Sequence, residues 1–160
     1  MKIVPIGLIH SPFKDTDGTP IQPHYARGVR GTVEIEPKFA EGLRDLDGFE
    51  RIWLIYWLHR SRPYELTVVP YRDTVSRGLF ATRAPSRPNS IGLTSVKLLE
   101  VSGNRLIVED VDILDETPLL DIKPYVPNAD AYQCERTGWL KSDTVNRDRA
   151  DDRFDEDDKR

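Results

Sequence analysis

The segment from residue 78 to residue 94 carries the densest group of side chains that could bind an anion. Arg83, Arg87 and Asn89 follow one another closely, and two prolines stiffen the turn that bears them. Two guanidinium groups and an amide can hold a carboxylate or a phosphate through charged, forked hydrogen bonds. Gly92 would let the chain approach a neighbouring group closely. The alternative is a rigid turn whose arginines pair with nearby acids, and the residue types leave both interpretations open.

A second polar run, residues 112–125, combines a turn with an extended segment. The turn, at residues 115–117, precedes a proline. Beyond it an acid, an amine and a phenol alternate and so share one side of an extended chain: Asp121, Lys123 and Tyr125. Such a set could grip a ligand's polar groups or move a proton. Taken alone, however, the run favours a turn acid bonded to its own backbone and a surface ion pair.

The histidines and the single cysteine carry weaker signals. His59 and Arg60 follow a run of apolar residues, where a stacking or hydrogen-bonding role is open, although an isolated histidine is more often structural. His10 and His24 share no metal-ligand spacing with His59, so we predict no metal site. Cys134 lacks the surrounding signature of a nucleophilic cysteine, and covalent catalysis is not expected.

Short strands have to position these residues. Arg51–Leu58 is almost continuously apolar and is predicted to be covered on both faces, whereas residues 32–36 alternate as a strand with one solvated face would. A further strand is expected to end at Arg83. The predicted strands are Lys2–Ile9, Gly31–Glu36, Arg51–Leu58, Leu66–Val69, Leu98–Val101 and Leu106–Val111.

Helix and long loops complete the predicted organisation. Phe39–Leu46 suggests one short helix that ends at Gly48. The long irregular segments His10–Arg30 and Ala84–Asn89 are the first places to expect a site. We therefore predict an all-β fold with minor helix, a barrel or a sandwich. No strand–GxGxxG–helix unit occurs, which argues against a Rossmann nucleotide site.

The amino-acid composition limits the classes of protein to which this chain can belong. The 160 residues, 38% hydrophobic and 31% charged, suit one folded domain. A net charge of −4 disfavours a general nucleic-acid binder, but arginines outnumber acids between residues 60 and 87, so a local anionic partner or a solvated face is expected. One cysteine and short apolar runs predict a cytoplasmic protein without a membrane segment. Residues 1–140 are expected to form the domain, and the charged residues 141–160 an unordered or weakly helical tail.

Taken together, these segments resemble the TsaA/TrmO-like (YaeB-like) family of tRNA methyltransferases. The shared strings occur in family order and cover most of the predicted domain. They include Ile6-Gly7-Leu8-Ile9-His10-Ser11-Pro12-Phe13, Gln22-Pro23, Phe80-Ala81-Thr82-Arg83, Arg87-Pro88-Asn89, Ile91-Gly92-Leu93 and Asp121-Ile122-Lys123-Pro124-Tyr125.

The resemblance implies a single-domain β-barrel, unlike a Rossmann fold, that acts as a homodimer and binds S-adenosylmethionine near its interface. It implies methyl transfer to N6 of threonylcarbamoyladenosine at tRNA position 37, beside the anticodon, with no metal. Carried onto this sequence, the cofactor positions are Ile21, Gln22, Pro23, His59, Arg60, Arg83, Leu93, Asp115, Thr117, Pro118, Ile122 and Lys123.

The same resemblance suggests roles for the remaining polar residues. Arg87 and Asn89 become candidates for substrate binding. The acceptor nitrogen is amide-like and a poor nucleophile, so its proton must leave. Our hypothesis is that Asp121 or Tyr125 accepts or relays that proton, while Lys123 tunes the acid.

One departure and two alternatives accompany this interpretation. Glu116 stands where the family usually has the glycine of Asp-Gly-Thr-Pro, and it adds charge and stiffness to the turn. A non-catalytic RNA- or nucleotide-binding barrel would use the arginines to grip phosphate and would lose RNA affinity when Arg83 is changed. A methyltransferase with another acceptor would bind the cofactor tightly without preferring threonylcarbamoylated tRNA.

Overall fold

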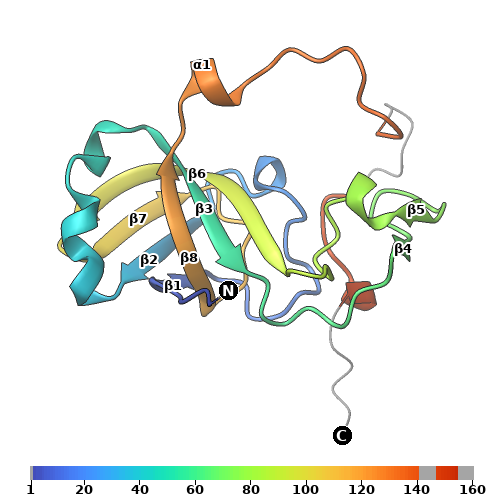
Figure 1. Cartoon of the computed structure of the whole chain (residues 1–160), viewed down its shortest axis with the longest axis horizontal. Helices are drawn as coiled ribbons and strands as arrows, with labels where there is room; N and C mark the ends of the chain where they lie inside the picture. Colours follow the sequence, from blue (N-terminus) through green and yellow to red (C-terminus); the bar gives the residue numbers. More distant parts are fainter. Residues whose placement is uncertain (1, 141–146, 155–160) are drawn as a thin grey trace, which may run out of the picture.

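The computed structural model describes residues 2–140 and 147–154 and contains a closed antiparallel β-barrel (Figure 1). The strands pair in the order β1-β2-β7-β6-β3-β8. The predicted all-β barrel is therefore confirmed. The strand bounds are Gly7–His10 (β1), Arg30–Ile35 (β2), Arg51–Trp57 (β3), Ile91–Ser102 (β6), Arg105–Glu109 (β7) and Thr117–Pro124 (β8).

Alternate residues of the strands point inward and build the core of the barrel. Val33 and Ile35 of β2 are buried, as are Ile52 and Leu54 of β3. The prediction that β3 is covered on both faces is wrong, because its second face is the outside of the barrel. There the side chains are only partly covered, and Trp57 is 49% exposed.

The predicted helix over residues 39–46 is replaced by two short 3₁₀ turns, Pro37–Leu43 and Leu46–Gly48. Asp45 lies between them with a φ of 66°. This left-handed conformation cannot continue a right-handed helix, so the segment breaks there. The two turns lie at the end of the barrel opposite the lobe described next (Figure 1).

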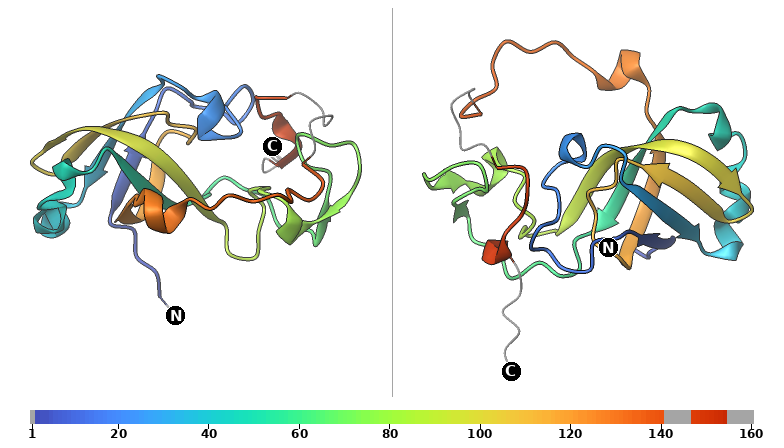
Figure 2. Two further views of the ribbon diagram at one scale, coloured as in Figure 1. Left: turned by 90° about the horizontal axis from the view of Figure 1, so that it is seen from above. Right: turned by 180° about the vertical axis from the view of Figure 1, so that it is seen from behind.

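A smaller lobe of loops stands beside the other end of the barrel (Figures 1 and 2). It holds a two-stranded sheet of β4 (Thr67–Val68) and β5 (Arg77–Gly78). The prediction of a strand that ends at Arg83 is wrong, because a 3₁₀ turn, Leu79–Ala81, follows β5. The backbone N–H and the hydroxyl of Thr82 both donate to the Leu79 carbonyl and hold this turn.

An arm connects β8 to the lobe. It begins with the single helical turn α1 (Pro127–Asp130) and continues through residues 131–140, which arch over the molecule (Figure 1). Near its far end, Trp139 Nε1 donates to the Ala81 carbonyl at 2.7 Å. The guanidinium of Arg77 lies 5.6 Å from the Trp139 ring centroid.

Residues 147–154, which the sequence places in a flexible or weakly helical tail, pack against the folded body. Arg149 pairs with Pro20 in an isolated β-bridge, and a 3₁₀ turn, Asp152–Phe154, follows. Phe154 is only 3% exposed. The rest of the predicted tail, 141–146 and 155–160, lies outside the described residues. In the described ranges, no helix has the length and apolarity needed to cross a bilayer.

Candidate functional site

A cavity of about 450 Å³ lies where the barrel meets the lobe. Its volume falls within the ~300–1,000 Å³ of typical small-molecule sites. The walls come from the first long loop (residues 16–23), the end of β3 and the residues after it, the turn at residues 82–87, the start of β6 and residues 112–117. Both irregular segments singled out in the sequence thus contribute to it.

The cavity gathers many of the candidate residues from distant parts of the chain. Those that line it are Ile21, Gln22, Pro23, His59, Arg60, Arg83, Arg87, Leu93 and Thr117. The others do not form part of its wall in a single chain. These are Asn89, Asp115, Pro118, Asp121, Ile122, Lys123 and Tyr125.

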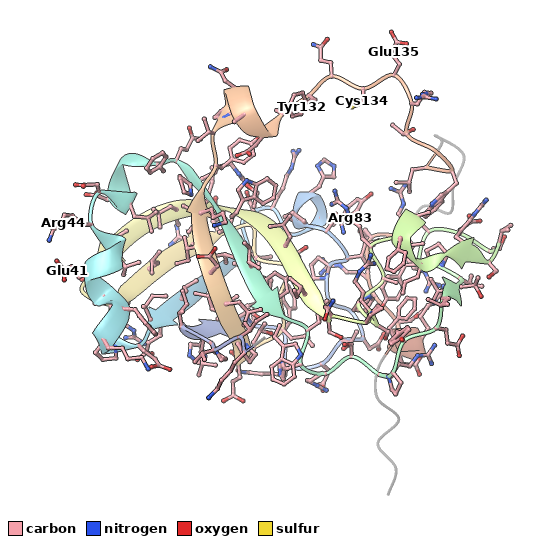
Figure 3. All side chains as sticks on the ribbon, viewed as in Figure 1. Glu41, Arg44, Arg83, Tyr132, Cys134 and Glu135 are labelled. Atoms are coloured by element: carbon pink, nitrogen blue, oxygen red, sulfur yellow. The ribbon has the colours of Figure 1, made fainter. Side chains whose placement is uncertain are left out.

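The two arginines of the 82–87 turn have different roles. Arg87 Nη1 donates to the backbone carbonyls of Thr82 (3.1 Å) and Ala84 (3.3 Å), and its guanidinium lies 5.7 Å from the Phe80 ring centroid. Arg83, labelled in Figure 3, is exposed. Its Nη1 donates instead to Gln22 Oε1 on the first loop. Arg87 therefore braces the turn, and Arg83 is the cation presented to the cavity.

His59 and Arg60 connect β3 to the first loop. Burial lowers the pKa of His59, and the positive charge of Arg60 lowers it further, so the imidazole is neutral near pH 7. Arg60 Nη1 donates to the Lys14 carbonyl, and Arg60 Nη2 lies 3.6 Å from Asp15 Oδ1. The cavity wall therefore combines a neutral imidazole with a guanidinium already paired on its loop side.

Asp115 holds the first loop from outside the cavity. Burial opposes its ionisation, but hydrogen bonds from the Lys14 ammonium and the Ser11 backbone N–H outweigh that effect and lower its pKa. The next residue, Glu116, has a φ of 59°. This left-handed conformation suits the glycine that the resemblance leads one to expect and costs a residue with a Cβ ~1–2 kcal/mol.

Three of the remaining candidates share the outer face of the barrel. Asp121 forms an ion pair of 2.8 Å with Lys123, and both side chains are largely solvated. The ring of Tyr125 lies 5.5 Å from that of Trp53, a neighbour on β3. The predicted alternation on one side of an extended segment is confirmed, but it points these groups away from the interior of their own barrel.

Ile122 faces the other way, and its side chain packs against the core cluster of the barrel. Pro118 pairs with Leu8 across the β1–β8 ladder. Asn89 is exposed, and its backbone carbonyl accepts a hydrogen bond from Ile91 N at 2.6 Å. These residues support the walls of the barrel and its connecting turn.

Sequence reasoning missed three polar residues at the buried end of the cavity: Tyr56, Thr94 and Asp112. All three line it. Tyr56 and Thr94 occupy inward positions of β3 and β6, and Asp112 follows β7. A usable signal was the polar Thr94 between the buried Gly92 and Val96, since a polar residue on the inward face of a strand needs a partner there.

Residues 147–154 supply a further wall that the sequence did not suggest. Ala150 and Phe154 line the cavity. The segment ties down the first loop, because Ala150 N donates to the Thr19 carbonyl (2.8 Å) and Ile21 N donates to the Asp148 carbonyl (3.0 Å). We call residues 147–154 the strap.

The other end of the strap holds the lobe. Arg62 N donates to the Phe154 carbonyl at 3.3 Å, and the Phe154 and Tyr71 rings meet edge to face at 5.1 Å. Phe154 also packs in a small cluster with Val68, Leu79 and Ala84. One segment late in the sequence therefore contacts two loop regions that both line the cavity.

Comparison with known proteins places this chain among SAM-binding and tRNA-modifying relatives. It is 51% identical over 148 residues (92% of this chain, 80% of the relative) to a probable S-adenosyl-L-methionine-binding protein of Pyrococcus abyssi. It is 37% identical over 136 residues to the tRNA (adenine(37)-N6)-methyltransferase of Mus musculus, covering 81% of this chain and 32% of the mouse protein.

A crystal structure of TrmO from Pseudomonas aeruginosa superposes with a TM-score of 0.73 at 39% identity. The match covers 88% of this chain and 63% of the solved one, so this chain spans less than two thirds of that protein. In the part of the chain that the structure describes, no three His, Cys, Asp or Glu side chains gather where they could hold a metal ion.

The family model for the tRNA-methyltransferase O N-terminal domain matches residues 8–131. This range contains every strand of the barrel except the first residue of β1. It also contains the candidate residues drawn from the family resemblance. The family resemblance itself is confirmed. The chain belongs to the TrmO family.

Proposed function

We propose that this protein is an S-adenosylmethionine-dependent methyltransferase that modifies N6 of threonylcarbamoyladenosine at position 37 of tRNA. The observation that carries the proposal is the cavity itself. It brings Gln22, His59 and Arg83, from three separate segments, into the lining of one cavity in a chain of the TrmO family. A cytoplasmic setting, where tRNA is modified, belongs to the same proposal.

The residues of the cavity suit the proposed cofactor. Ile21, Pro23 and Leu93 offer apolar surface to an adenosine, and Arg83 offers a cation to the carboxylate of its amino acid part. The cofactor supplies a methyl group activated on a sulfonium, so transfer requires alignment with an acceptor and needs no metal. The protein's task is to hold the acceptor nitrogen in line, which can contribute ~7–11 kcal/mol to lowering the barrier.

The test is a methylation assay with two RNA substrates. Anticodon stem-loops carry either adenosine or threonylcarbamoyladenosine at position 37, and mass spectrometry of the nucleosides locates the methyl group. We expect methyl transfer only to the threonylcarbamoylated stem-loop. Transfer to the unmodified adenosine would indicate a different acceptor. Absence of both cofactor binding and transfer, with Arg83-dependent RNA binding, would favour a binding barrel.

We further propose that the protein works as a homodimer whose interface borders the cavity. On the outer face of the barrel, Trp57 and Ile91 are neighbours in the β3–β6 ladder, as are Ile55 and Leu93. Leu93 is 58% exposed and also lines the cavity. A second copy seated on this apolar face would cover the cavity mouth. It would also place Asp121 and Lys123 of the neighbouring β8, and Tyr125 just after that strand, near the contact between subunits.

Replacing Leu93 by Glu is expected to convert the dimer to a monomer in analytical ultracentrifugation, because the change places a charge in an apolar contact. Cofactor affinity should fall with it. Leu99→Glu is the matched control, since Leu99 is 43% exposed on the same strand but is not part of the cavity wall. A wild-type protein that sediments as a monomer at micromolar concentration would contradict the proposed dimer.

A further inference from the structure

Three polar side chains form a continuous hydrogen-bonded chain at the inner end of the cavity. Tyr56 Oη lies 3.0 Å from Thr94 Oγ1, and Thr94 Oγ1 donates to Asp112 Oδ1 at 2.9 Å. Tyr56 is 7% exposed and Thr94 only 2%. The ring of Tyr56 packs in the core of the barrel, and the polar groups of all three side chains would be costly to bury without partners.

The chain has a direction. An ionised carboxylate can only accept hydrogen bonds, so the single hydroxyl proton of Thr94 is committed to Asp112. Thr94 Oγ1 must then accept the proton of Tyr56. Both hydroxyls therefore point toward the carboxyl group, and together they fix its orientation at the cavity wall. Gly92 makes this arrangement possible, because a Cβ there would lie 2.2 Å from a ring carbon of Tyr56.

The surroundings bring this carboxyl group into the range of physiological proton exchange. Burial raises the pKa of Asp112 to about 7, against the opposing effects of the Thr94 hydrogen bond and the charge of Arg83. Burial and the charge of Asp112 raise the pKa of Tyr56, which stays protonated. The other titratable side chains of the cavity wall are His59, Arg60, Tyr71 and Arg87. A carboxyl group of this kind matches the requirement of a general base at neutral pH.

We propose that Asp112 accepts the proton of the acceptor nitrogen during methyl transfer, and that Thr94 and Tyr56 are positioning residues for its carboxylate. This inference rests on the proposed function. In the step, the bond between N6 and the methyl carbon forms as the carbon–sulfur bond breaks, and sulfur takes the electron pair. The N6 proton passes to Asp112, which later releases it to water.

Asp112 fits this role better than the acid favoured from the sequence. Asp121 lies on the outer face of the barrel, is paired with Lys123 at 2.8 Å and is not part of the cavity wall of its own chain. Asp112 is in the wall, has no ion-pair partner within 4 Å among the described residues and already receives an oriented hydrogen bond. Burial in the wall is what distinguishes a proton acceptor from a solvated surface ion pair.

The test compares Asp112→Asn with wild type in single-turnover methylation at saturating cofactor. We expect a loss of ~100-fold or more, the range of general base catalysis. Cofactor affinity, measured by calorimetry, should change less than about threefold, because the proposed role concerns the proton and not cofactor binding. Asp47→Asn, an exposed acid at the far end of the barrel, is the matched control and should keep the wild-type rate.

The positioning residues have a separate readout that does not depend on activity. Carboxyl-carbon NMR of the free protein should show Asp112 titrating near its pKa of about 7 in the wild type. Thr94→Val should move this titration to higher pH, because the lost hydrogen bond favoured the ionised form. The wild-type rate should rise with pH until Asp112 is ionised, and this rise should shift in the same direction in Thr94→Val.

Three outcomes would overturn the proposal. An unchanged single-turnover rate for Asp112→Asn would remove Asp112 as the proton acceptor. A rate restored by more cofactor, together with an affinity weakened tenfold or more, would make Asp112 a cofactor ligand instead. No transfer by the wild-type protein to the threonylcarbamoylated stem-loop would overturn the proposed function, and this inference with it.

Discussion

Replacing Arg83 by alanine is expected to weaken S-adenosylmethionine binding about 10- to 100-fold, as measured by calorimetric titration. Hydrogen bonds to charged groups contribute ~1.5–3 kcal/mol, and each 1.4 kcal/mol corresponds to about tenfold in affinity. Arg87 is occupied with the backbone of its own turn, so it cannot replace the lost cation. The loss should also release Gln22, the partner that Arg83 holds on the first loop.

Arg44→Ala is the matched control for the loss of an arginine. Arg44 forms an exposed ion pair of 3.0 Å with Glu41 at the end of the barrel far from Arg83 (Figure 3). Exposed pairs of this kind contribute little to stability, so this variant should bind the cofactor as the wild type does. If Arg83→Ala kept its affinity for the cofactor but lost affinity for RNA, the guanidinium would bind an RNA phosphate. That result would favour the alternative of a non-catalytic binding barrel.

Replacing Gly92 by alanine is expected to lower the melting temperature by about 2–12 °C. The added Cβ would lie 2.2, 2.4 and 2.7 Å from three carbons of the Tyr56 ring, which is itself packed in the core. Overpacking of this kind costs ~1–3 kcal/mol, and in a domain of this size 1 kcal/mol corresponds to about 2–4 °C. Differential scanning calorimetry measures the shift. Because the ring must move, the bond from Tyr56 to Thr94 should weaken too.

A double-mutant cycle identifies the cause of the expected loss. In a Tyr56→Leu background the ring is gone, so Gly92→Ala should cost much less than in the wild type. Gly42→Ala controls for the substitution itself, since a Cβ at Gly42 would meet no atom within 4 Å. If Gly92→Ala lowered the melting temperature equally in both backgrounds, contact with the Tyr56 ring would not be the cause of the destabilisation.

The sequence was most informative where one face of a strand is apolar and the other solvated. Residues 32–36 alternate and indeed lie in or beside β2, and the predicted strands Leu98–Val101 and Leu106–Val111 correspond to the paired strands β6 and β7. The start of β6 was harder to predict. Its inward residues there include Gly92, which leaves room for the Tyr56 ring, and the polar Thr94, which borders the cavity. The alternation of apolar and polar residues does not predict the strand at such positions, because its inward side chains face a cavity there instead of the apolar core.

The candidate site was predictable only in part for a similar reason. The resemblance supplied Gln22, His59 and Arg83, and the fold brings them together. Asp112 gives no local signal of its role, because its burial depends on β3 and β6 folding against it. The packing of the strap could not be predicted from its composition, because most of its residues are charged. The carboxylate of Asp151 forms an ion pair with Arg153 at 2.7 Å, and the neighbouring Phe154 packs inward.

The strap also sets an order of events during protein synthesis. Strands β1 to β8 are complete once residue 124 has left the ribosome, so the barrel can close while later residues are still being added. The cavity wall, however, includes Ala150 and Phe154, and residues 147–154 contact both the first loop and the lobe. A nascent chain would therefore hold a folded barrel before the wall of its cavity is complete.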